Sequence, residues 1–367
     1  MKLSEFAKEC RDTWKEDRSG VPVVGLEHLE PGEVKLSAWD VDSENTFTKR
    51  FNKGQVLLGR RRVYLRKAVV APFDGICSGD ITVIEAIPGK ILPELLPFVI
   101  QNDAFFDYAE QGSAGSLSPR VKWEHLKDFE VNLPSIDDQK ALAEKLWAAY
   151  RLKESYKKLL AATDEMVKSR FIEMFGDPSV NNLGLKTKKL SQLGSVDRGV
   201  SKARPRNSPD LLGGPYPLIQ TGEIASAKHY ITNFEQTYSE KGLAQSKMWP
   251  KGTLCITIAA NIADTAILDI EACFPDSVVG FISNGDVETM FMHYWFMFLQ
   301  STLERQAPQT AQKNINLEIL RNLDVIVPSM DEQASFVRIV EQADKSGFEL
   351  RKSIESIDTV IKSLINN

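Results

Sequence analysis

The chain contains few residues of the types that hold metals or form disulfides. Among its 367 residues there are only four cysteines and four histidines. No Cys-x-x-Cys pair occurs among Cys10, Cys77, Cys255 and Cys273. No helical i, i+4 ligand pair occurs among His28, His125, His229 and His293. We therefore expect no metal site and read the cysteines as reduced thiols, which is typical of a cytoplasmic protein.

Long apolar runs are missing as well. No stretch approaches the roughly 18 apolar residues of a membrane span, and the first residues, Met1–Phe6, lack the apolar core and cleavage site of a signal peptide. Hydrophobic residues make up 43% of the chain and charged residues 26%, which is ordinary for a folded globular protein. The length allows two or three domains.

Common catalytic motifs are also absent. The chain has no G-x-x-x-x-G-K-[ST] phosphate loop, no H-E-x-x-H, no G-x-G-x-x-G after a strand, and no Asn-Pro-Pro-Tyr or Asp-Pro-Pro-Tyr. Gly75–Gly79 (Gly-Ile-Cys-Ser-Gly) resembles a nucleophile elbow with Cys77 in the serine position. That motif needs a helix next, whereas Asp80–Ile84 reads as a strand. We expect no catalytic residue, and a thiol enzyme that uses Cys77 is a remote alternative.

What the chain does contain is an internal repeat. Lys53–Leu58 recurs as Lys251–Ile256, at an offset of 198. A second block, at an offset of 194, contains Trp123, Leu126, Phe129, Val131, Leu133 and Pro134, which recur as Leu317, Leu320, Leu323, Val325, Val327 and Pro328. Asp137-Asp138-Gln139 and Asp331-Glu332-Gln333 follow. This self-similarity indicates a duplication and suggests a target with two related halves.

Each repeat begins with short runs rich in β-branched residues, which favour strands. The first copy has Val21–Val24, Gln55–Leu58, Lys67–Val70 and Ile81–Ile84, and the second has Tyr216–Ile219, Leu254–Ile258, Thr265–Leu268 and Val278–Ile282. A helical stretch follows in each copy, Leu92–Ala109 and Glu288–Gln306, and then a last short strand, Phe129–Leu133 and Leu323–Val327.

Each repeat ends in a long helix. Apolar or small residues recur in steps of four and three at 142, 146, 149, 156, 160, 163 and 167, and at 336, 340, 343, 350, 354, 357, 361 and 364. Lys153 and Gly347 interrupt the two seams, and Gly176 is suited to the position after the first helix. We expect the helices to pack on each other; the alternative is that each packs only on its own domain.

These patterns predict an α+β protein with a pseudo-two-fold repeat, in which two β-rich domains are separated by two long helices that form an antiparallel coiled coil. The expected boundaries are 1–134 for the first domain, 135–178 for the first helix, 179–328 for the second domain and 329–367 for the second helix.

The net charge of −5 by itself argues against nucleic acid, but basic residues cluster. Lys49–Lys67 contains eight basic residues and no acid, and Lys186–Arg206 contains seven with one Asp197. Both runs lie in the non-helical part of their repeat. They fit either solvated loops or surfaces that bind a polyanion.

The whole chain resembles the specificity subunit of type I restriction-modification systems. The resemblance rests on the alternating domains and helices, together with Val131–Pro134, Phe175–Pro178, Tyr238–Ala244 and Pro250–Thr253. The first domain departs from the pattern, since it lacks an equivalent of Ser239–Ala244.

The resemblance implies two target recognition domains that each read one half of a split, asymmetric site in double-stranded DNA. The helices would set the spacer. The implied partners are two methyltransferase (M) subunits, which bind S-adenosylmethionine and methylate adenine at N6, and two restriction and translocase (R) subunits. The chain itself would bind no cofactor and catalyse nothing. A coiled-coil scaffold that never reads DNA is the runner-up.

Candidate DNA-binding residues are arginines, which pair with guanine edges or phosphates, and polar side chains in loops at matching places. In the first domain they are Arg60, Arg61, Arg62, Tyr64, Arg66, Ser118 and Arg120. In the second they are Lys202, Arg204, Arg206, Gln220, Thr221, Asn261, Gln312, Lys313 and Asn314. Loop hydrogen bonds to the backbone are the alternative for Gln220 and Asn261.

Overall fold

The computed structural model describes residues 1–115, 117–259, 262–306 and 315–366. The chain forms two compact units: unit 1 contains Met1–Lys158 and Leu350–Asn367, and unit 2 contains Leu159–Glu349. Both division points lie inside long helices, so each unit combines one β-rich domain with a part of each helix. The boundaries expected from the sequence separate each β-rich domain from the long helix after it. The two compact units instead group the residues that pack together, so each unit includes parts of both long helices.

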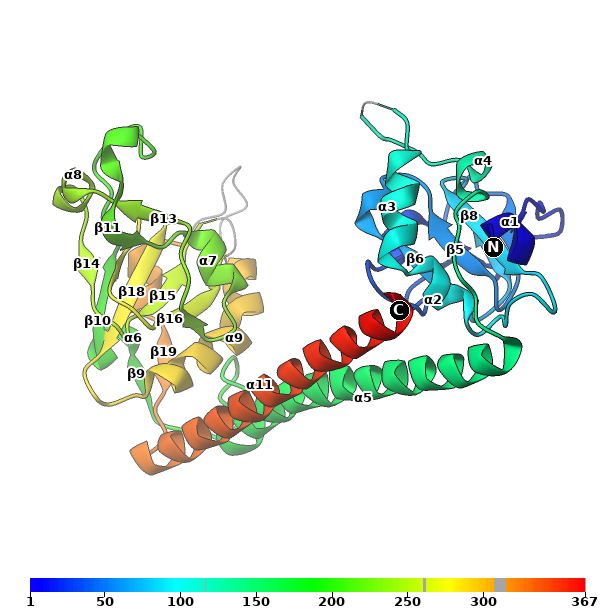
Figure 1. Ribbon diagram of the computed structural model, residues 1–367. Coiled ribbons are helices and arrows are strands. Elements are labelled where there is room, and N and C mark those ends of the chain that lie inside the picture. Colours follow the sequence, from blue (N-terminus) through cyan, green and yellow to red (C-terminus); the bar gives the residue numbers. More distant parts are fainter. Residues whose placement is uncertain (116, 260–261, 307–314, 367) are drawn as a thin grey trace. The chain divides into compact units, whose positions relative to one another are not determined.

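Unit 1 contains two four-stranded sheets (Figure 1). The first is antiparallel and has the order β1 (Ala7–Cys10), β8 (Ile81–Ala86), β5 (Val56–Gly59), β6 (Ala68–Val70). The second has the order β3 (Asp40–Val41), β2 (Pro22–Val24), β7 (Gly75–Cys77), β4 (Lys49–Phe51). In the second sheet β2 and β7 are parallel.

Unit 2 repeats this topology. One sheet has the order β10 (Gly194–Arg198), β18 (Val278–Ser283), β15 (Leu254–Thr257), β16 (Thr265–Leu268), β12 (Tyr230–Ile231). The other has the order β13 (Gln236–Tyr238), β11 (Leu212–Leu218), β17 (Ala272–Cys273), β14 (Met248–Trp249), with β11 and β17 parallel. Apart from the added edge strand β12, both orders match those of unit 1. The duplication predicted from the sequence is therefore confirmed in the strand order.

The repeated Lys-Gly dipeptide lies in equivalent tight turns before β5 and β15. Gly54 has a φ of +87° and Gly252 a φ of +89°, a backbone conformation that favours glycine. Each glycine donates its N–H to the end of the neighbouring strand, Gly54 to Ala71 just after β6 and Gly252 to Leu268 of β16, both at 2.8 Å. The motif recurs because both copies need the same turn.

The repeated glutamine joins each long helix to its domain. Gln139 is buried; its amide oxygen accepts from the Leu92 N–H at 3.0 Å and its amide nitrogen donates to the Pro134 carbonyl at 3.1 Å. Gln333 is buried in the same arrangement. Its amide oxygen accepts from the Glu288 N–H at 2.9 Å, and its amide nitrogen donates to the Pro328 carbonyl at 2.9 Å. The acidic-Gln motif therefore has a structural role in both copies.

The helical stretch of the first copy is broken. Instead of one helix over Leu92–Ala109 there are two, α2 (Leu96–Ile100) and α3 (Asp103–Gln111). Asn102 separates them because its side chain caps α3, accepting from the Ala104 N–H at 2.7 Å. The second copy has the continuous helix that was predicted, α9 (Thr289–Gln306). The short helices are α1 (Leu3–Phe6), α4 (Trp123–Leu126), α6 (Leu190–Leu193), α7 (Thr221–Ser226), α8 (Glu240–Ala244) and α10 (Leu317–Arg321).

The last strand predicted for each copy is present in the second copy and absent from the first. In the second copy it is present as β19 (Asp324–Ile326), paired with β9 (Thr187–Lys189). In the first copy the predicted strand over Phe129–Leu133 is wrong: an isolated bridge joins Lys2 and Glu130. The pairing cannot extend because its partner segment turns into α1 at Leu3.

The two long helices are α5 (Ile136–Phe175) and α11 (Met330–Asn366), and they pack on each other within each unit. In unit 2, Phe171 and Phe336 lie with ring centroids 5.3 Å apart. Lys228 bridges Asp164 of α5 at 2.7 Å and Asp344 of α11 at 3.0 Å. Asp164 lies near Asp344, and Phe171, later in α5, lies near Phe336, earlier in α11. The two helices are therefore antiparallel, as predicted.

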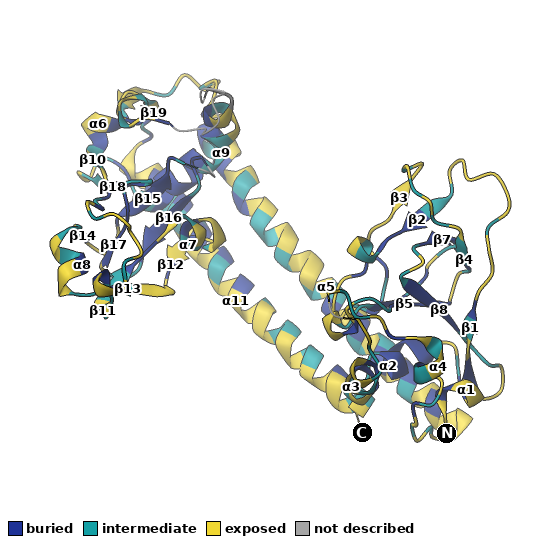
Figure 2. Cartoon of the chain, turned by 90° about the horizontal axis from the view of Figure 1, so that it is seen from above, coloured by how far each residue is buried: buried dark blue, intermediate teal, exposed yellow. Residues whose placement is uncertain are grey.

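The helices pack on the domains as well as on each other, so the alternative in which each helix packs only on its own domain does not hold. Leu146 and Tyr150 of α5 and Ile361 of α11 share a core with the first domain, and Val167, Phe171 and Val340 share one with the second. Figure 2 shows buried residues along one face of each helix and exposed residues along the other. Among the described residues, no helix is long and apolar enough to cross a membrane.

Neither interruption of the seam breaks it. Lys153 and Gly347 are both buried in the seam, and Lys153 is neutralised by Asp358 at 2.7 Å and Glu33 at 3.3 Å. The two positions that interrupt the apolar pattern are therefore packed like the rest of the seam. The predicted end of α5 is confirmed: Gly176 has a φ of +72° and donates its N–H to Ile172 at 2.8 Å.

Candidate nucleic-acid interface

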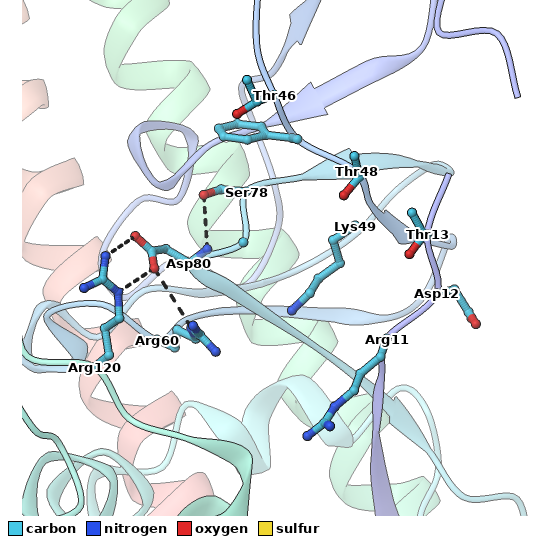
Figure 3. Close-up of a pocket in the computed structure, with 12 residues that line it drawn as sticks. Arg11, Asp12, Thr13, Thr46, Thr48, Lys49, Arg60, Ser78, Asp80 and Arg120 are labelled. Atoms are coloured by element: carbon cyan, nitrogen blue, oxygen red, sulfur yellow. Dashed lines mark hydrogen bonds and ion pairs between the residues drawn. The ribbon is translucent and has the colours of Figure 1, made fainter. Parts of the chain in front are cut away.

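Three of the predicted arginines of the first domain converge on one carboxylate, Asp80, in the turn between β7 and β8 (Figure 3 draws two of them, Arg60 and Arg120). Arg120 donates from Nε at 2.7 Å and from Nη2 at 3.1 Å, one bond to each carboxylate oxygen. Arg60 and Arg61 lie farther off, at 4.0 Å and 3.9 Å. The hydrogen bond from Arg120 lowers the pKa of Asp80 below its usual range. The carboxylate is therefore charged at neutral pH.

The backbone brings these arginines together from distant segments. Arg60 and Arg61 directly follow β5, and the Arg60 N–H donates to the Asp80 carbonyl at 2.9 Å. Arg61 and Arg120 form an isolated β-bridge. Arg61 also donates from Nη2 to the Ser118 hydroxyl at 2.9 Å. Arg60, Arg61, Ser118 and Arg120 thus form one cluster.

The other candidates of this domain lie in or beside the short turn Val63–Leu65, which buried Val63 ties to the core. Tyr64 is half exposed there. The Arg62 N–H donates to the Pro119 carbonyl at 2.8 Å. Arg66 forms ion pairs with Asp103 and, at 3.1 Å, with Asp107 of α3. Its charge is compensated there, so the structure separates Arg66 from the Asp80 cluster.

A surface cavity of about 680 Å³ adjoins the cluster (Figure 3). It is lined by Arg11, Asp12, Thr13, Thr46, Phe47, Thr48, Lys49, Arg60, Ser78, Gly79, Asp80 and Arg120. Lys49 reaches into it and donates to the Ile81 carbonyl at 2.8 Å, and burial lowers the pKa of this ammonium. Four cations and several hydroxyls facing one open cavity suit a polyanion better than a neutral ligand.

Sequence reasoning missed most of this lining. Lys49 belongs to the basic run that the sequence showed, but it was not chosen as a site residue. Arg11 and Asp80 carry no local signal at all, since one follows an edge strand and the other is a lone acid in a turn. Only the fold brings them beside Arg60 and Arg120.

The second domain has a similar arrangement around Asp276. Arg206 pairs with one oxygen of this carboxylate, and Arg204 lies 3.5 Å from the other. Arg204 also donates to the carbonyls of Ser201 and Ala203, at 2.7 Å and 2.8 Å. Asp276 stands just before β18, as Asp80 stands just before the equivalent strand β8. Lys202 is exposed on the same loop, and its N–H donates to Gln245 at 2.7 Å.

The remaining candidates are less closely gathered. Gln220 precedes α7 and donates from its amide to the Gln236 side chain at 3.1 Å. Thr221 is the first residue of α7. Asn261, Gln312, Lys313 and Asn314 lie outside the described residues.

Two histidines that are isolated in the sequence meet in the fold. His229 and His293 are buried with ring nitrogens 3.1 Å apart, and His229 lies 3.3 Å from Asp344. Burial lowers the pKa of His293 to about 3. No group of three or more metal-binding side chains is found in the part of the chain that the structure describes. The two histidines are thus buried together in unit 2.

The thiol alternative is not supported by the geometry. Cys77 lies fully buried in β7, and burial raises the pKa of its thiol to about 12. A nucleophilic cysteine needs an accessible thiolate. The chemistry that the surface offers is recognition through arginine forks and hydroxyls.

Comparison with known proteins finds similarity to proteins of one kind. Residues 182–357 match the sequence model of a family described as type I restriction modification DNA specificity domain. The type I restriction enzyme EcoDI specificity subunit of Escherichia coli is 26% identical over 193 residues, 51% of this chain and 38% of that protein. A putative type I restriction enzyme MjaX specificity subunit of Methanocaldococcus jannaschii is 19% identical over 375 residues, 95% of this chain and 86% of that protein. The match to EcoDI thus spans less than half of that relative.

A solved structure has the same fold. A chain from a study of complex assembly and conformational transition of a type I R-M system superposes with a TM-score of 0.64 and 16% identity. The alignment covers 100% of the present chain and 95% of that chain. The predicted fold class is confirmed.

Proposed function

We propose that the chain belongs to the family of type I restriction-modification specificity subunits and is the sequence-specific DNA-recognition subunit of such a complex. Each β-rich domain reads one half of a bipartite, asymmetric site in double-stranded DNA. The observation that carries this proposal is the pair of arginine clusters. Both are held by an aspartate in the equivalent turn between the two sheets of the domain, yet the arginines come from different segments. A common frame with different contacts is what two different half-sites require.

The helices α5 and α11 set the spacer between the half-sites and dock two M subunits. These subunits bind S-adenosylmethionine and methylate adenine at N6, and two R subunits join for cleavage. The chain itself holds no cofactor, catalyses nothing and works in the cytoplasm. Exposed apolar side chains on the helices support docking there, among them Leu159 at 52% and Phe348 at 61% exposure.

A coiled-coil scaffold that never reads DNA would account for α5 and α11. It gives no reason for the cations that face the cavity beside Asp80, or for the same arrangement in the second domain. If the chain reads DNA, its binding to DNA should weaken steeply as the salt concentration rises. If it is only a scaffold, it should not bind DNA.

The direct test is a genome-wide map of N6-methyladenine in cells with and without this gene. We expect a split motif that disappears when the gene is removed. The motif would give both half-sites and the spacer. An unchanged map in cells that express an M subunit bound to this chain would contradict the proposal.

Replacing residues 186–324 with the corresponding domain of another family member shows which half-site each domain reads. Only one half-site should change, and that half belongs to the second domain. A change in both halves would contradict independent reading by two domains.

A further inference from the structure

The pairing of Arg120 with Asp80 leaves one edge of the arginine open. Asp80 accepts from Nε and Nη2, which form the side edge of the guanidinium. The end edge, formed by Nη1 and the second N–H of Nη2, has no partner among the described residues. The Arg120 side chain is 44% exposed and lines the surface cavity beside Asp80. Its two parallel N–H groups match the spacing of O6 and N7 of guanine in the major groove.

We propose that Arg120 reads a guanine in the half-site of the first domain and that Asp80 is the positioning residue that aims it. This rests on the proposed function as a DNA reader and goes beyond it, because it assigns a base type to a side chain. A flexible arginine loses several rotatable bonds when it binds a base edge. The two hydrogen bonds to Asp80 fix the fork beforehand, which lowers that entropic cost.

The neighbouring arginines have a different role. Arg60 and Arg61 lie beyond hydrogen-bond distance of Asp80, and their Nε atoms are buried without an acceptor among the described residues. The Asp80 carboxylate therefore accepts its hydrogen bonds from Arg120, while Arg60 and Arg61 place positive charge around Asp80. Together with Lys49 in the adjoining cavity, they are placed to contact phosphates, which position the duplex without specifying sequence.

The second domain supports the assignment independently. Asp276 holds Arg206 and Arg204 at the equivalent turn, although both arginines come from the loop after β10, a segment unrelated to the one that carries Arg120. Arg204 is tied to the carbonyls of Ser201 and Ala203. Arg206 is therefore the counterpart of Arg120, and Asp276 the counterpart of Asp80.

The test uses the complex of this chain with its M subunits and compares the base preferences of wild type, Arg120→Lys, Asp80→Asn and Asp276→Asn. Lysine keeps the charge of Arg120 but loses the fork. Arg120→Lys should reduce discrimination at one G·C pair of the first half-site about tenfold to a hundredfold. Asp80→Asn should act at the same pair, and Asp276→Asn only in the other half-site.

Each variant carries its own folding control, because unchanged recognition of the half-site that it should not affect shows that the complex is folded and assembled. Asp128→Asn is a matched control in the first domain, since Asp128 is exposed and paired with Lys2 at 2.9 Å. It should leave both half-sites unchanged.

A base analogue tests the contact without relying on a mutation alone. Replacing each guanine of the first half-site in turn with 7-deazaguanine removes the N7 acceptor. The wild-type complex should lose about tenfold in affinity at one position. The Arg120→Lys complex should lose nothing further at that position.

Several results would overturn the proposal. A first half-site without any G·C pair, or an Arg120→Lys complex with unchanged base preferences, removes Arg120 as a reader. An effect of Arg120→Lys without one of Asp80→Asn removes Asp80 as a positioning residue. A wild-type complex with no sequence preference in either half-site contradicts the proposed function itself, which is a separate outcome.

Discussion

Lys153 of α5 and Asp358 of α11 form an ion pair of 2.7 Å inside unit 1. The ammonium also lies 3.3 Å from Glu33, in the loop before β3 of the first domain. Burial disfavours the charged ammonium, but the hydrogen bond to Asp358 and the charge of Glu33 raise the pKa of Lys153 above its ordinary value. One buried cation thus joins both helices to the first recognition domain.

Replacing Lys153 should therefore destabilise unit 1 in a way that depends on the substitute. Lys153→Ala leaves Asp358 and Glu33 without this cation and should cost about 2 kcal/mol, a value lowered because Asp358 is partly exposed. Lys153→Met fills the space and should cost less. Urea unfolding followed by circular dichroism measures both. Equal stability of wild type and Lys153→Ala would contradict this role.

The buried histidine pair predicts a pH dependence for unit 2. His293 has a pKa of about 3 in the folded chain and of about 6.5 when unfolded. Between these pH values the unfolded state binds more protons than the folded state. The contribution of neutral His293 to the free energy of unfolding is therefore complete above about pH 6.5 and is lost as the pH falls.

His293→Asn should flatten that dependence. The free energy of unfolding of the wild type should fall by up to about 1.4 kcal/mol per pH unit from this group as pH drops from about 6.5 to 5. Denaturant titrations of both proteins at several pH values measure the difference in slope. Identical slopes would show that His293 does not titrate in this way.

The two junction glutamines should be equally important for stability. Gln333→Ala leaves the N–H of Glu288 without its acceptor and should cost about 2 kcal/mol, and Gln139→Ala should cost about the same at Leu92. Gln342→Ala, at an exposed position of α11, is the control and should stay within about 0.5 kcal/mol of wild type. Thermal unfolding compares the three. A cost for only one of the two junction variants would mean that the junctions are not equivalent.

Arg60 and Arg61 should contribute to DNA binding without specifying bases. Replacing both with alanine should weaken binding to all sequences alike and lower the slope of log affinity against log salt by about 2, one unit for each lost phosphate contact. Lys2→Ala is the control, because Lys2 is paired with Asp128. Binding assays over a range of salt concentrations measure the slope. A changed motif with an unchanged slope would instead assign base contacts to these residues.

The elements that the sequence predicted well are those whose cause is local. Gly54 and Gly252 mark the turns before β5 and β15 because only a left-handed backbone fits there. The capping signal at Gly176 gave the end of α5 for the same reason. The break at Asn102 was also local, but the apolar pattern of the surrounding residues concealed it.

The elements that the sequence mispredicted or did not indicate depend on distant partners. The strand over Phe129–Leu133 fails because its partner segment turns into α1 at Leu3. Lys153 is compatible with the helix seam only because Glu33 and Asp358 reach it. Asp80 gathers arginines from two separate segments, and nothing near it in the sequence indicates this. Long-range contacts of this kind cannot be read from spacing or composition.

The two arginine clusters differ in how freely they can evolve. Arg204 and Arg206 lie on a loop whose residues 202–207 are exposed or half-exposed. Arg60 and Arg120 are instead held by backbone hydrogen bonds next to buried Val121. Random mutation costs folding stability less in the exposed loop than beside the core. Related lineages are therefore expected to diverge first in the half-site read by the second domain, while the first half-site changes more slowly.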